Sequence, residues 1–431
     1  MARSVLGAIA ALALCVIVLA GAFEAFPYQP GADFYQFWGV PVAKRLSGSG
    51  HTPYVDPAGY AATLNALSDA SSSSKLHAAN ALRRTLEPMA TPFLYAAFAI
   101  FPADYDAAHA IFVTLVYSSA ALGVMALASL RGLGFRMALC AAFAMELTFA
   151  PFMLDVRAGN INSLQLALIA ALVLAAGRNA STGRPWGDAL LLGILAPFVI
   201  FKPNTVWIAA ALAVQFALAR GRQELLRGIG VGAVLAAAAL AIGAGYFGSA
   251  SAWPEWLSLA GSMEKGLPLS PEQGNESLAL WLARHGGTYG ALGYGALIGA
   301  ALLLLLLLAF TSMGRRIDLL LPAAKRAFSS PGFAASVGVV LTFATSPLVW
   351  AHYFVLALVP IAWLVGRDGW RGAGTWGAVL CYAALARVTI DFLVATHTAW
   401  LHAITMLSWV ALVPGLLAFA AEQRRSVEAA A

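Results

Sequence analysis

The sequence predicts an all-α membrane protein, a polytopic helical bundle with about 12 transmembrane helices. Hydrophobic residues make up 61% of the chain and charged residues only 11%, with a mean hydropathy of +0.78, whereas soluble domains carry roughly 25% charged residues. Apolar runs of helix length recur, and the most extreme, 301–310, contains seven consecutive leucines. These runs do not alternate polar and apolar residues as the strands of a membrane barrel do. In hydrocarbon they must pair their backbone groups internally, so we expect helices.

Short basic segments between the apolar runs predict the orientation of the helices. Most of the 26 Lys and Arg residues lie in these segments, which are 131–136, 177–188, 220–227, 313–327, 367–372 and 422–428. The positive-inside rule places the segments and both chain ends in the cytoplasm, as in a multi-pass protein of the plasma (inner) membrane. The net charge of +6 therefore reflects orientation, and we expect no nucleic-acid partner.

The number of crossings follows from parity, because the chain must cross an even number of times between two cytoplasmic segments. Five stretches are each expected to form a hairpin: 137–176, 189–219, 228–312, 332–366 and 374–421. Helices at 6–23 and 107–130 complete the twelve, with a cleaved signal peptide as the alternative for the first. The stretch 92–102 is bracketed by prolines and too short to cross, so it is predicted to be re-entrant or interfacial.

Two polar loops are expected on the outer side of a single transmembrane domain, 1–431. The first, 24–91, is predicted to contain a helix over about 76–86, and the second, 249–288, is amphipathic and contains tryptophans. Acidic residues concentrate in the outer segments. The chain contains no phosphate-binding loop, dinucleotide-binding, zinc-protease, paired-cysteine or nucleophile-elbow motif, so the corresponding soluble chemistries have no support.

Asp33 is the first candidate for chemistry. It follows the first apolar run and lies among the aromatic residues Tyr28, Phe34, Tyr35 and Trp38. A carboxylate among aromatic rings at the membrane interface is partly desolvated and becomes a better general base. The alternative is that Asp33 caps a short interfacial helix that begins at Phe34.

A polar turn at 154–165 supplies the next candidates. Asp155 and Arg157 form either a local ion pair or part of a binding site, and Asn160 either caps the next helix or binds a ligand. Asn162 enters the same predicted membrane helix. More than one amide at the start of a helix exceeds what a cap requires, so binding of a polyol such as a sugar is a plausible use.

Further candidates lie at other predicted outer turns. Lys202 either extends its side chain to the interface or binds a lipid phosphate. His352, in a turn with Trp350 and Tyr353, is either a structural or a functional residue. Arg387 and Asp391 stand four residues apart on one helix and are expected to pair with each other.

Several short motifs succeed one another at the predicted outer face. They are Asp33-Phe34-Tyr35-Gln36-Phe37-Trp38, His51-Thr52-Pro53-Tyr54, the proline-bracketed stretch 92–102, Gly159-Asn160-Ile161-Asn162, Lys202-Pro203, Asn275-Glu276-Ser277-Leu278, and Ser346-Pro347 with Trp350 and His352-Tyr353. In this order, over about 5–366, they resemble glycosyltransferase family 87, membrane mannosyltransferases of the GT-C type that use polyprenol-phosphate sugars. Asn160 stands where the family usually has Gln, and Ala351 replaces one of a pair of histidines.

The resemblance implies a GT-C-like fold and an inverting transfer of a sugar at the outer (periplasmic) side. The expected sugar is mannose, the donor a polyprenyl-phosphate sugar, and the acceptor a hydroxyl of an envelope lipid or glycan. It implies catalytic roles for Asp33, as general base, and His352, donor-phosphate binding by Lys202 and Arg157, and sugar or acceptor binding by Asn160, Asn162, Asn275, Trp350 and Tyr353. No metal or cofactor is expected, because a phosphate leaving group needs charge stabilisation. Membrane lipids are the other expected partners.

Two functions of other classes stay open at this point. One is a flippase or transporter of lipid-linked sugars, and the other is an assembly subunit of an envelope complex. Transporters place polar residues near the bilayer midplane, often on broken helices. Here the polar residues gather at one predicted face, which favours surface chemistry.

Overall fold

The structure is a computed structural model, and it describes residues 9–14, 16–17, 30–48, 50–182, 185–219, 222–266, 274–286, 288–311, 319–369, 372–396 and 400–430. The described chain is helical throughout, at 82% helix with no strands. Two isolated β-bridges pair Phe149 with Ala386 and Asn275 with Trp350. The all-α prediction is confirmed.

The helices vary widely in length. Their bounds are α2 Ala32–Ser47, α3 Pro57–Asp69, α4 Ser74–Leu82, α5 Pro92–Phe98, α6 Tyr105–Leu130, α7 Phe135–Thr148, α8 Ala150–Ala158, α9 Asn162–Thr182, α10 Pro185–Gly193, α11 Leu195–Phe201, η1 Pro203–Thr205, α12 Val206–Ala219, α13 Arg222–Phe247, α14 Ala252–Gly266, α15 Leu278–Gly286, α16 Ala291–Phe310, α17 Leu320–Phe328, α18 Pro331–Thr345, η4 Ala351–Ala357, α19 Leu358–Leu364, α20 Ala373–Ala384, α21 Arg387–Ala395, α22 Trp400–Leu407, η5 Ser408–Leu412 and α23 Val413–Glu428.

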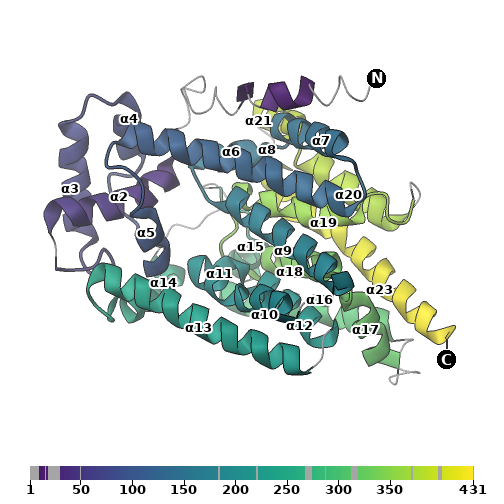
Figure 1. Cartoon of the computed structure of the whole chain (residues 1–431). Helices are drawn as coiled ribbons and strands as arrows, with labels where there is room; N and C mark the ends of the chain where they lie inside the picture. The colour runs from purple at the N-terminus through teal and green to yellow at the C-terminus, as the bar shows by residue number, and fades with distance from the viewer. Residues whose placement is uncertain are drawn as a thin grey trace.

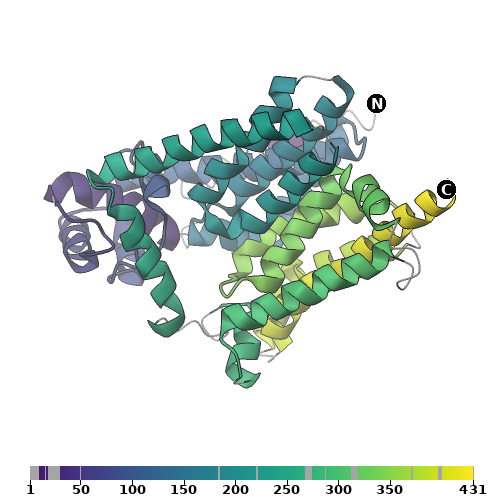
Figure 2. The ribbon, with the colours of Figure 1, turned by 90° about the horizontal axis from the view of Figure 1, so that it is seen from below.

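Helices α2 to α5 form a small module at one end of the molecule, opposite the end of α23 (Figure 1). Three of these four helices begin at a side-chain cap, with Asp56, Ser73 and Thr91 accepting hydrogen bonds from the first turns of α3, α4 and α5. Such caps replace the backbone partners that a helix start lacks. Helix α14 turns away from the end of α13 (Figure 2) and docks on this module through the Trp256 indole, which donates to the Met89 carbonyl at 3.1 Å.

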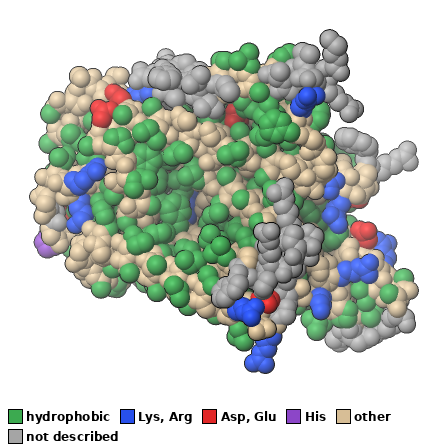
Figure 3. Space-filling model, in the orientation of Figure 1, with side chains coloured by type: hydrophobic (Ala, Val, Ile, Leu, Met, Phe, Trp, Pro, Cys, Tyr) green, Lys and Arg blue, Asp and Glu red, His purple; other side chains and the backbone are tan. Residues whose placement is uncertain are grey.

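Four described helices are long and apolar enough to cross a membrane, or five if the pair α17 and α18, bent by 97°, forms one span. The four are α6, α13, α16 and the run from Trp400 to Glu428. On the face shown in Figure 3 hydrophobic side chains predominate, whereas Lys and Arg side chains lie mainly at the left and right ends and along the lower edge. The membrane character of the chain is therefore supported, and the count of twelve crossings stays a prediction.

The central helices pack through small residues. A Cβ added at Gly338 of α18 would lie 2.5 Å from the Ile208 Cα of α12, so only glycine permits this approach. In the α2–α5 module, residues 92–102 contain the seven-residue helix α5, which packs against α2 and α13. The helix expected at 76–86 begins and ends earlier, at Ser74–Leu82. The predicted helix 6–23 lies mostly outside the described residues.

Candidate functional site

Asp33 lies in the first turn of α2 and does not cap it. The N-cap residue is Gly31, and it makes no side-chain cap. The Asp33 carboxylate instead accepts hydrogen bonds from Arg83 Nη2 at 3.1 Å and from Asn160 Nδ2 at 2.7 Å. The cap interpretation of Asp33 is therefore wrong, because both carboxylate oxygens are engaged by side chains distant in sequence.

The turn between α8 and α9 brings Asn160 to Asp33. Gly159 ends α8 with φ +71, a left-handed conformation that favours glycine. A Cβ at Gly159 would also lie 2.7 Å from the Phe34 Cβ and 2.9 Å from the Gly31 Cα. Glycine at this position thus allows the turn to close against the start of α2.

Lys202 holds two asparagine side chains in defined orientations. Its Nζ donates to Asn160 Oδ1 at 2.6 Å and to Asn162 Oδ1 at 3.0 Å. With its oxygen on the ammonium, each amide turns its nitrogen the other way: Asn160 donates to Asp33, and Asn162 Nδ2 donates to Asp155 Oδ1 at 2.8 Å. One cation therefore orients two amides toward two carboxylates.

Asp155 is fully buried and belongs to this network. Its Oδ2 accepts hydrogen bonds from the Ser163 backbone N at 2.9 Å and the Ser163 Oγ at 2.6 Å. Burial raises the pKa of Asp155 above its ordinary value, and burial lowers the pKa of Lys202 while the nearby carboxylates oppose that shift. The Asp155 carboxylate accepts its hydrogen bonds from Asn162 and Ser163, and the local ion pair with Arg157 does not form.

His352 and Tyr353 close the network from η4. His352 Nε2 lies 3.9 Å from Asp33 Oδ2 and has no hydrogen-bond partner among the described residues. The Lys202 Nζ lies 4.8 Å from the centroid of the Tyr353 ring, a cation–π contact. The structure thus brings Asp33, Asn160, Asn162, Lys202, His352 and Tyr353 together from four separate segments.

Asn275 holds the segment that precedes η4. Its Oδ1 accepts from the Val349 backbone N at 3.0 Å, and its Nδ2 donates to the Pro347 carbonyl at 3.2 Å. Asn275 also forms the β-bridge with Trp350. In the structure the Asn275 side chain is therefore occupied by the backbone of the turn that carries Trp350 and His352.

A cavity of about 550 Å³ adjoins the network. Its lining consists of Pro30, Ala32, Ala78, Leu82, Leu154, Arg157, Ala158, Gly274, Trp350, Ala351 and His352. Asp33 is not among these residues, but its chain neighbour Ala32 and the nearby His352 are, and the Asp33 side chain remains 17% exposed. Arg157 is exposed and makes no hydrogen bond or ion pair within the described part of the chain. Arg157, rather than Lys202, is the cation that lines this cavity.

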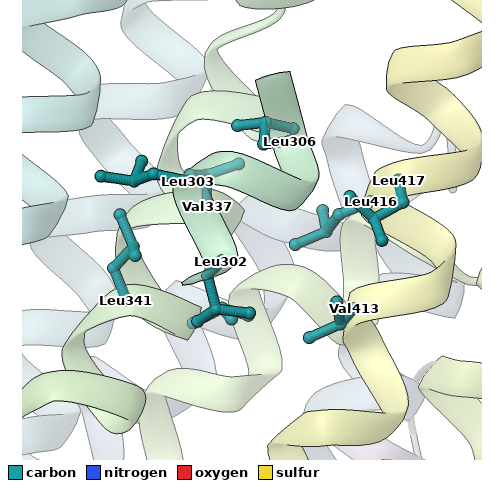
Figure 4. Close-up of a pocket in the computed structure, with 9 residues that line it drawn as sticks. Leu302, Leu303, Leu306, Val337, Leu341, Val413, Leu416 and Leu417 are labelled. Carbon is teal, nitrogen blue, oxygen red and sulfur yellow. The ribbon is translucent and has the colours of Figure 1, made fainter. Parts of the chain in front are cut away.

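A second cavity has an entirely apolar lining. It has a volume of about 30 Å³, and only leucine and valine side chains of α16, α18 and α23 line it (Figure 4). No titratable group contributes to it. The large polar-edged cavity beside Asp33 is therefore the candidate active site.

Arg83 and the pairing of Glu276 with His402 were not predicted, although Glu276 itself lies in the Asn275-Glu276-Ser277-Leu278 motif that the sequence singles out. Arg83 binds Asp33, and its Nη1 lies 3.5 Å from the Glu87 carboxylate. Its signal was two adjacent arginines in a predicted outer loop, against the positive-inside trend. Glu276 Oε1 lies 2.8 Å from His402 Nδ1, a contact that joins elements with no shared sequence pattern.

Other expectations concern metals and a surface ion pair. The described residues contain no group of three or more His, Cys, Asp or Glu side chains placed to hold a metal ion. The expected pair of Arg387 and Asp391 is confirmed, with Nε 3.4 Å from Oδ2, and both side chains are exposed.

Comparison with known protein families gives a match. The family model of glycosyltransferase family 87 matches residues 88–347, more than half of the chain. No curated protein and no solved structure matches. The matched range contains Asn160, Lys202 and Asn275, and the network around them reaches beyond it on both sides, to Asp33 and His352. The chain belongs to glycosyltransferase family 87, and it is accordingly a glycosyltransferase with the helices of a membrane protein.

Proposed function

We propose that this glycosyltransferase transfers mannose from a polyprenyl-phosphate donor to a hydroxyl group of an envelope lipid or glycan. The observation that carries the proposal is the Asp33 carboxylate beside the lining residues Ala32 and His352 of a cavity of about 550 Å³, with Arg157, which pairs with none of the described residues, on the cavity wall. In this proposal the Asp33 carboxylate accepts a proton and the Arg157 guanidinium binds a phosphate. A sugar transfer from a lipid phosphate requires these two functions.

Asp33 acts as the general base in an inverting displacement. It takes the proton of the acceptor hydroxyl as that oxygen forms a bond to the anomeric carbon. The bond from the anomeric carbon to the phosphate oxygen breaks, and polyprenyl phosphate leaves with the electron pair. The Arg83 guanidinium and the Asn160 amide hold the carboxylate in place through its Oδ1 and Oδ2 atoms, respectively. His352 Nε2, which has no hydrogen-bond partner among the described residues, lies 3.9 Å from Asp33 Oδ2. His352 orients the acceptor or the phosphate.

Two cations stabilise the leaving phosphate. Arg157 contacts it directly from the cavity wall, since a guanidinium binds phosphate oxygens through two parallel N–H groups. Lys202 adds positive charge from behind Asn160 and Asn162. Trp350, on the cavity wall, forms the aromatic side of the sugar and acceptor subsite, and Asn275 shapes it through the backbone at Trp350. Asn160, Asn162 and Tyr353 support the subsite from behind, through their contacts with Asp33 and Lys202.

A direct assay tests this function. Purified protein is incubated with radiolabelled polyprenyl-phosphate-mannose and envelope lipids, and transfer of label to the lipid or glycan fraction is measured. Label in a new product that Asp33→Asn does not form supports the proposal. Movement of intact donor across a vesicle bilayer without a new product would instead identify a flippase.

The proposed location is the plasma (inner) membrane, with twelve crossings, both chain ends in the cytoplasm and the site on the outer face. A cysteine in place of Ser72, in the loop between α3 and α4, should react with an impermeant thiol reagent in intact cells. A cysteine in place of Ser329, between α17 and α18, should react only after the cells are opened. Both serines are exposed, so equal labelling in intact cells would contradict the orientation.

A further inference from the structure

A second polar cavity, of about 430 Å³, lies at the far end of the bundle from the α2–α5 module. It forms where α19 ends, α20 begins and α23 approaches the C-terminus (Figure 1). Its lining consists of Leu364, Arg367, Asp368, Gly374, Gly415, Ala418, Phe419, Glu422 and Arg425. None of these residues takes part in the Asp33 network, so the cavity is separate from the candidate active site.

The guanidinium of Arg367 is held in a fixed place by aromatic rings. It lies 4.1 Å from the Phe419 ring centroid and 4.6 Å from that of Trp363. Stacking between rings restrains the side chain while leaving the N–H edge of the guanidinium available for hydrogen bonds. Arg425, one helical turn beyond Glu422 on α23, adds a second guanidinium to the same cavity.

The carboxylates of this cavity differ in what they already bind. Asp368 caps α20: it accepts from the Gly374 backbone N and the Thr375 Oγ1, both at 2.9 Å. Glu422 makes no hydrogen bond or ion pair with any residue that the structure describes. The Glu422 charge acts on Arg367, but no hydrogen bond or close ion pair among the described residues joins it to either arginine of the cavity.

Charges of both signs around an open space suit a ligand that itself carries both signs. Isolated charges at the edge of an apolar environment are costly unless they are paired. Leu364, Gly415 and Ala418 make part of the wall apolar, as expected at the level where acyl chains meet headgroups. An anionic headgroup would satisfy the arginines and repel Glu422, whereas a headgroup with both a phosphate and an ammonium group would satisfy all three.

We propose that this cavity binds the headgroup of a zwitterionic aminophospholipid, with Arg367 and Arg425 on its phosphate and Glu422 on its ammonium group. The lipid would sit between α19, α20 and α23 and join the last helix of the chain to the bundle. This site is independent of the glycosyl transfer proposed above.

Native mass spectrometry of the detergent-purified full chain tests the site. The protein is mixed with equal amounts of phosphatidylethanolamine, phosphatidylglycerol and phosphatidylcholine, and the retained lipid is counted. We expect one phosphatidylethanolamine to be retained about fivefold more than either other lipid, the scale of one charge contact at a membrane surface. Equal retention of the three would overturn the proposal.

Variants assign the two halves of the headgroup. Glu422→Gln should abolish the preference for phosphatidylethanolamine over phosphatidylglycerol while leaving total retention similar. Arg367→Gln and Arg425→Gln should each lower the retention of phosphatidylethanolamine and of phosphatidylglycerol. If loss of the stacked Arg367 side chain prevents folding, Arg425→Gln alone tests the phosphate half of the site. Arg136→Gln, an exposed arginine on α7 outside the cavity, should change neither. Unchanged selectivity in Glu422→Gln, or displacement of the lipid by millimolar inorganic phosphate alone, would show that the ligand is not a zwitterionic lipid.

Discussion

Two carboxylates near the large cavity have different surroundings. Both oxygens of Asp33 are hydrogen-bonded, by Arg83 and Asn160, yet its side chain stays 17% exposed. The Glu276 side chain is 5% exposed; one oxygen meets His402, and the other is buried without a partner among the described residues. Asp33 is fully oriented and accessible, whereas Glu276 is enclosed and only half satisfied.

The difference indicates separate roles. A general base must be held in one orientation and still reach a substrate, which describes Asp33. An enclosed glutamate that meets a single histidine joins two parts of the fold, and Glu276 connects the turn at Trp350, through its backbone N to the Val349 carbonyl at 2.6 Å, to α22. The first should govern the rate of transfer and the second the stability of the fold.

The largest expected effect is that of Asp33→Asn. The amide keeps the shape of the side chain but cannot accept a proton at neutral pH, so transfer should fall by about 10²-fold or more, the scale of general-base removal. Glu276→Gln is the matched control and should keep most of the activity. Rates are compared on detergent-purified, monodisperse protein. Near-normal turnover by Asp33→Asn, or an equal loss in both variants, would remove the distinction between the two carboxylates.

The next effect concerns Lys202, which orients the amide that holds Asp33. Lys202→Ala leaves Asn160 and Asn162 free to turn and removes positive charge near the leaving phosphate, so kcat should fall by about 10- to 10²-fold. Lys202→Arg should restore part of kcat, because it keeps the charge with a different shape. A change that appears in kcat reports a contact stronger in the transition state than in the ground state. Unchanged kcat and KM in the folded fraction of Lys202→Ala would reduce Lys202 to a structural residue.

A smaller effect is expected for Arg157 on the cavity wall. Arg157→Gln removes one charge-assisted contact to the donor phosphate, which corresponds to about a tenfold lower kcat/KM for the polyprenyl-phosphate donor. The KM for the acceptor should not change. Since Arg157 makes no intramolecular ion pair in the described chain, the thermal stability should also stay constant. A loss of stability with normal donor kinetics would mean that the donor phosphate binds elsewhere.

Much of this arrangement was predictable from local sequence. Apolar runs predicted the helices, and the polar residues between them predicted which turns would carry the site: 154–165, Lys202 and the turn at His352 all reach one network. A local sequence pattern depends on residues close together in the chain. For these turns, the polar residues that the local pattern identified also lie together in the folded structure.

The pairings themselves depend on tertiary packing and were not predictable. Arg83 reaches Asp33 across 50 residues, and His402 reaches Glu276 across 126. One local pattern was misleading: Asp155 lies two residues from Arg157 but binds Asn162 and Ser163 instead. The orientation of each asparagine depends on where the Lys202 ammonium lies, and sequence spacing does not give that position.

The smallest expected effect is the pH dependence of stability that comes from Glu276. Burial raises the pKa of Glu276 from its ordinary 4.5 to about 7, although His402 opposes the shift. A carboxyl group with a raised folded pKa stabilises the fold fully below its unfolded pKa, and this contribution is lost as the pH rises through the folded pKa. Between about pH 6 and pH 8 the folded protein should therefore lose about 1 kcal/mol, measured as a falling apparent melting temperature in detergent. Glu276→Gln cannot ionise and should flatten this slope, whereas Asp391→Asn, at an exposed side chain, should leave it in place. An identical pH slope in wild type and Glu276→Gln would mean that Glu276 is charged in the folded protein across this range, and that its pair with His402 is an ion pair.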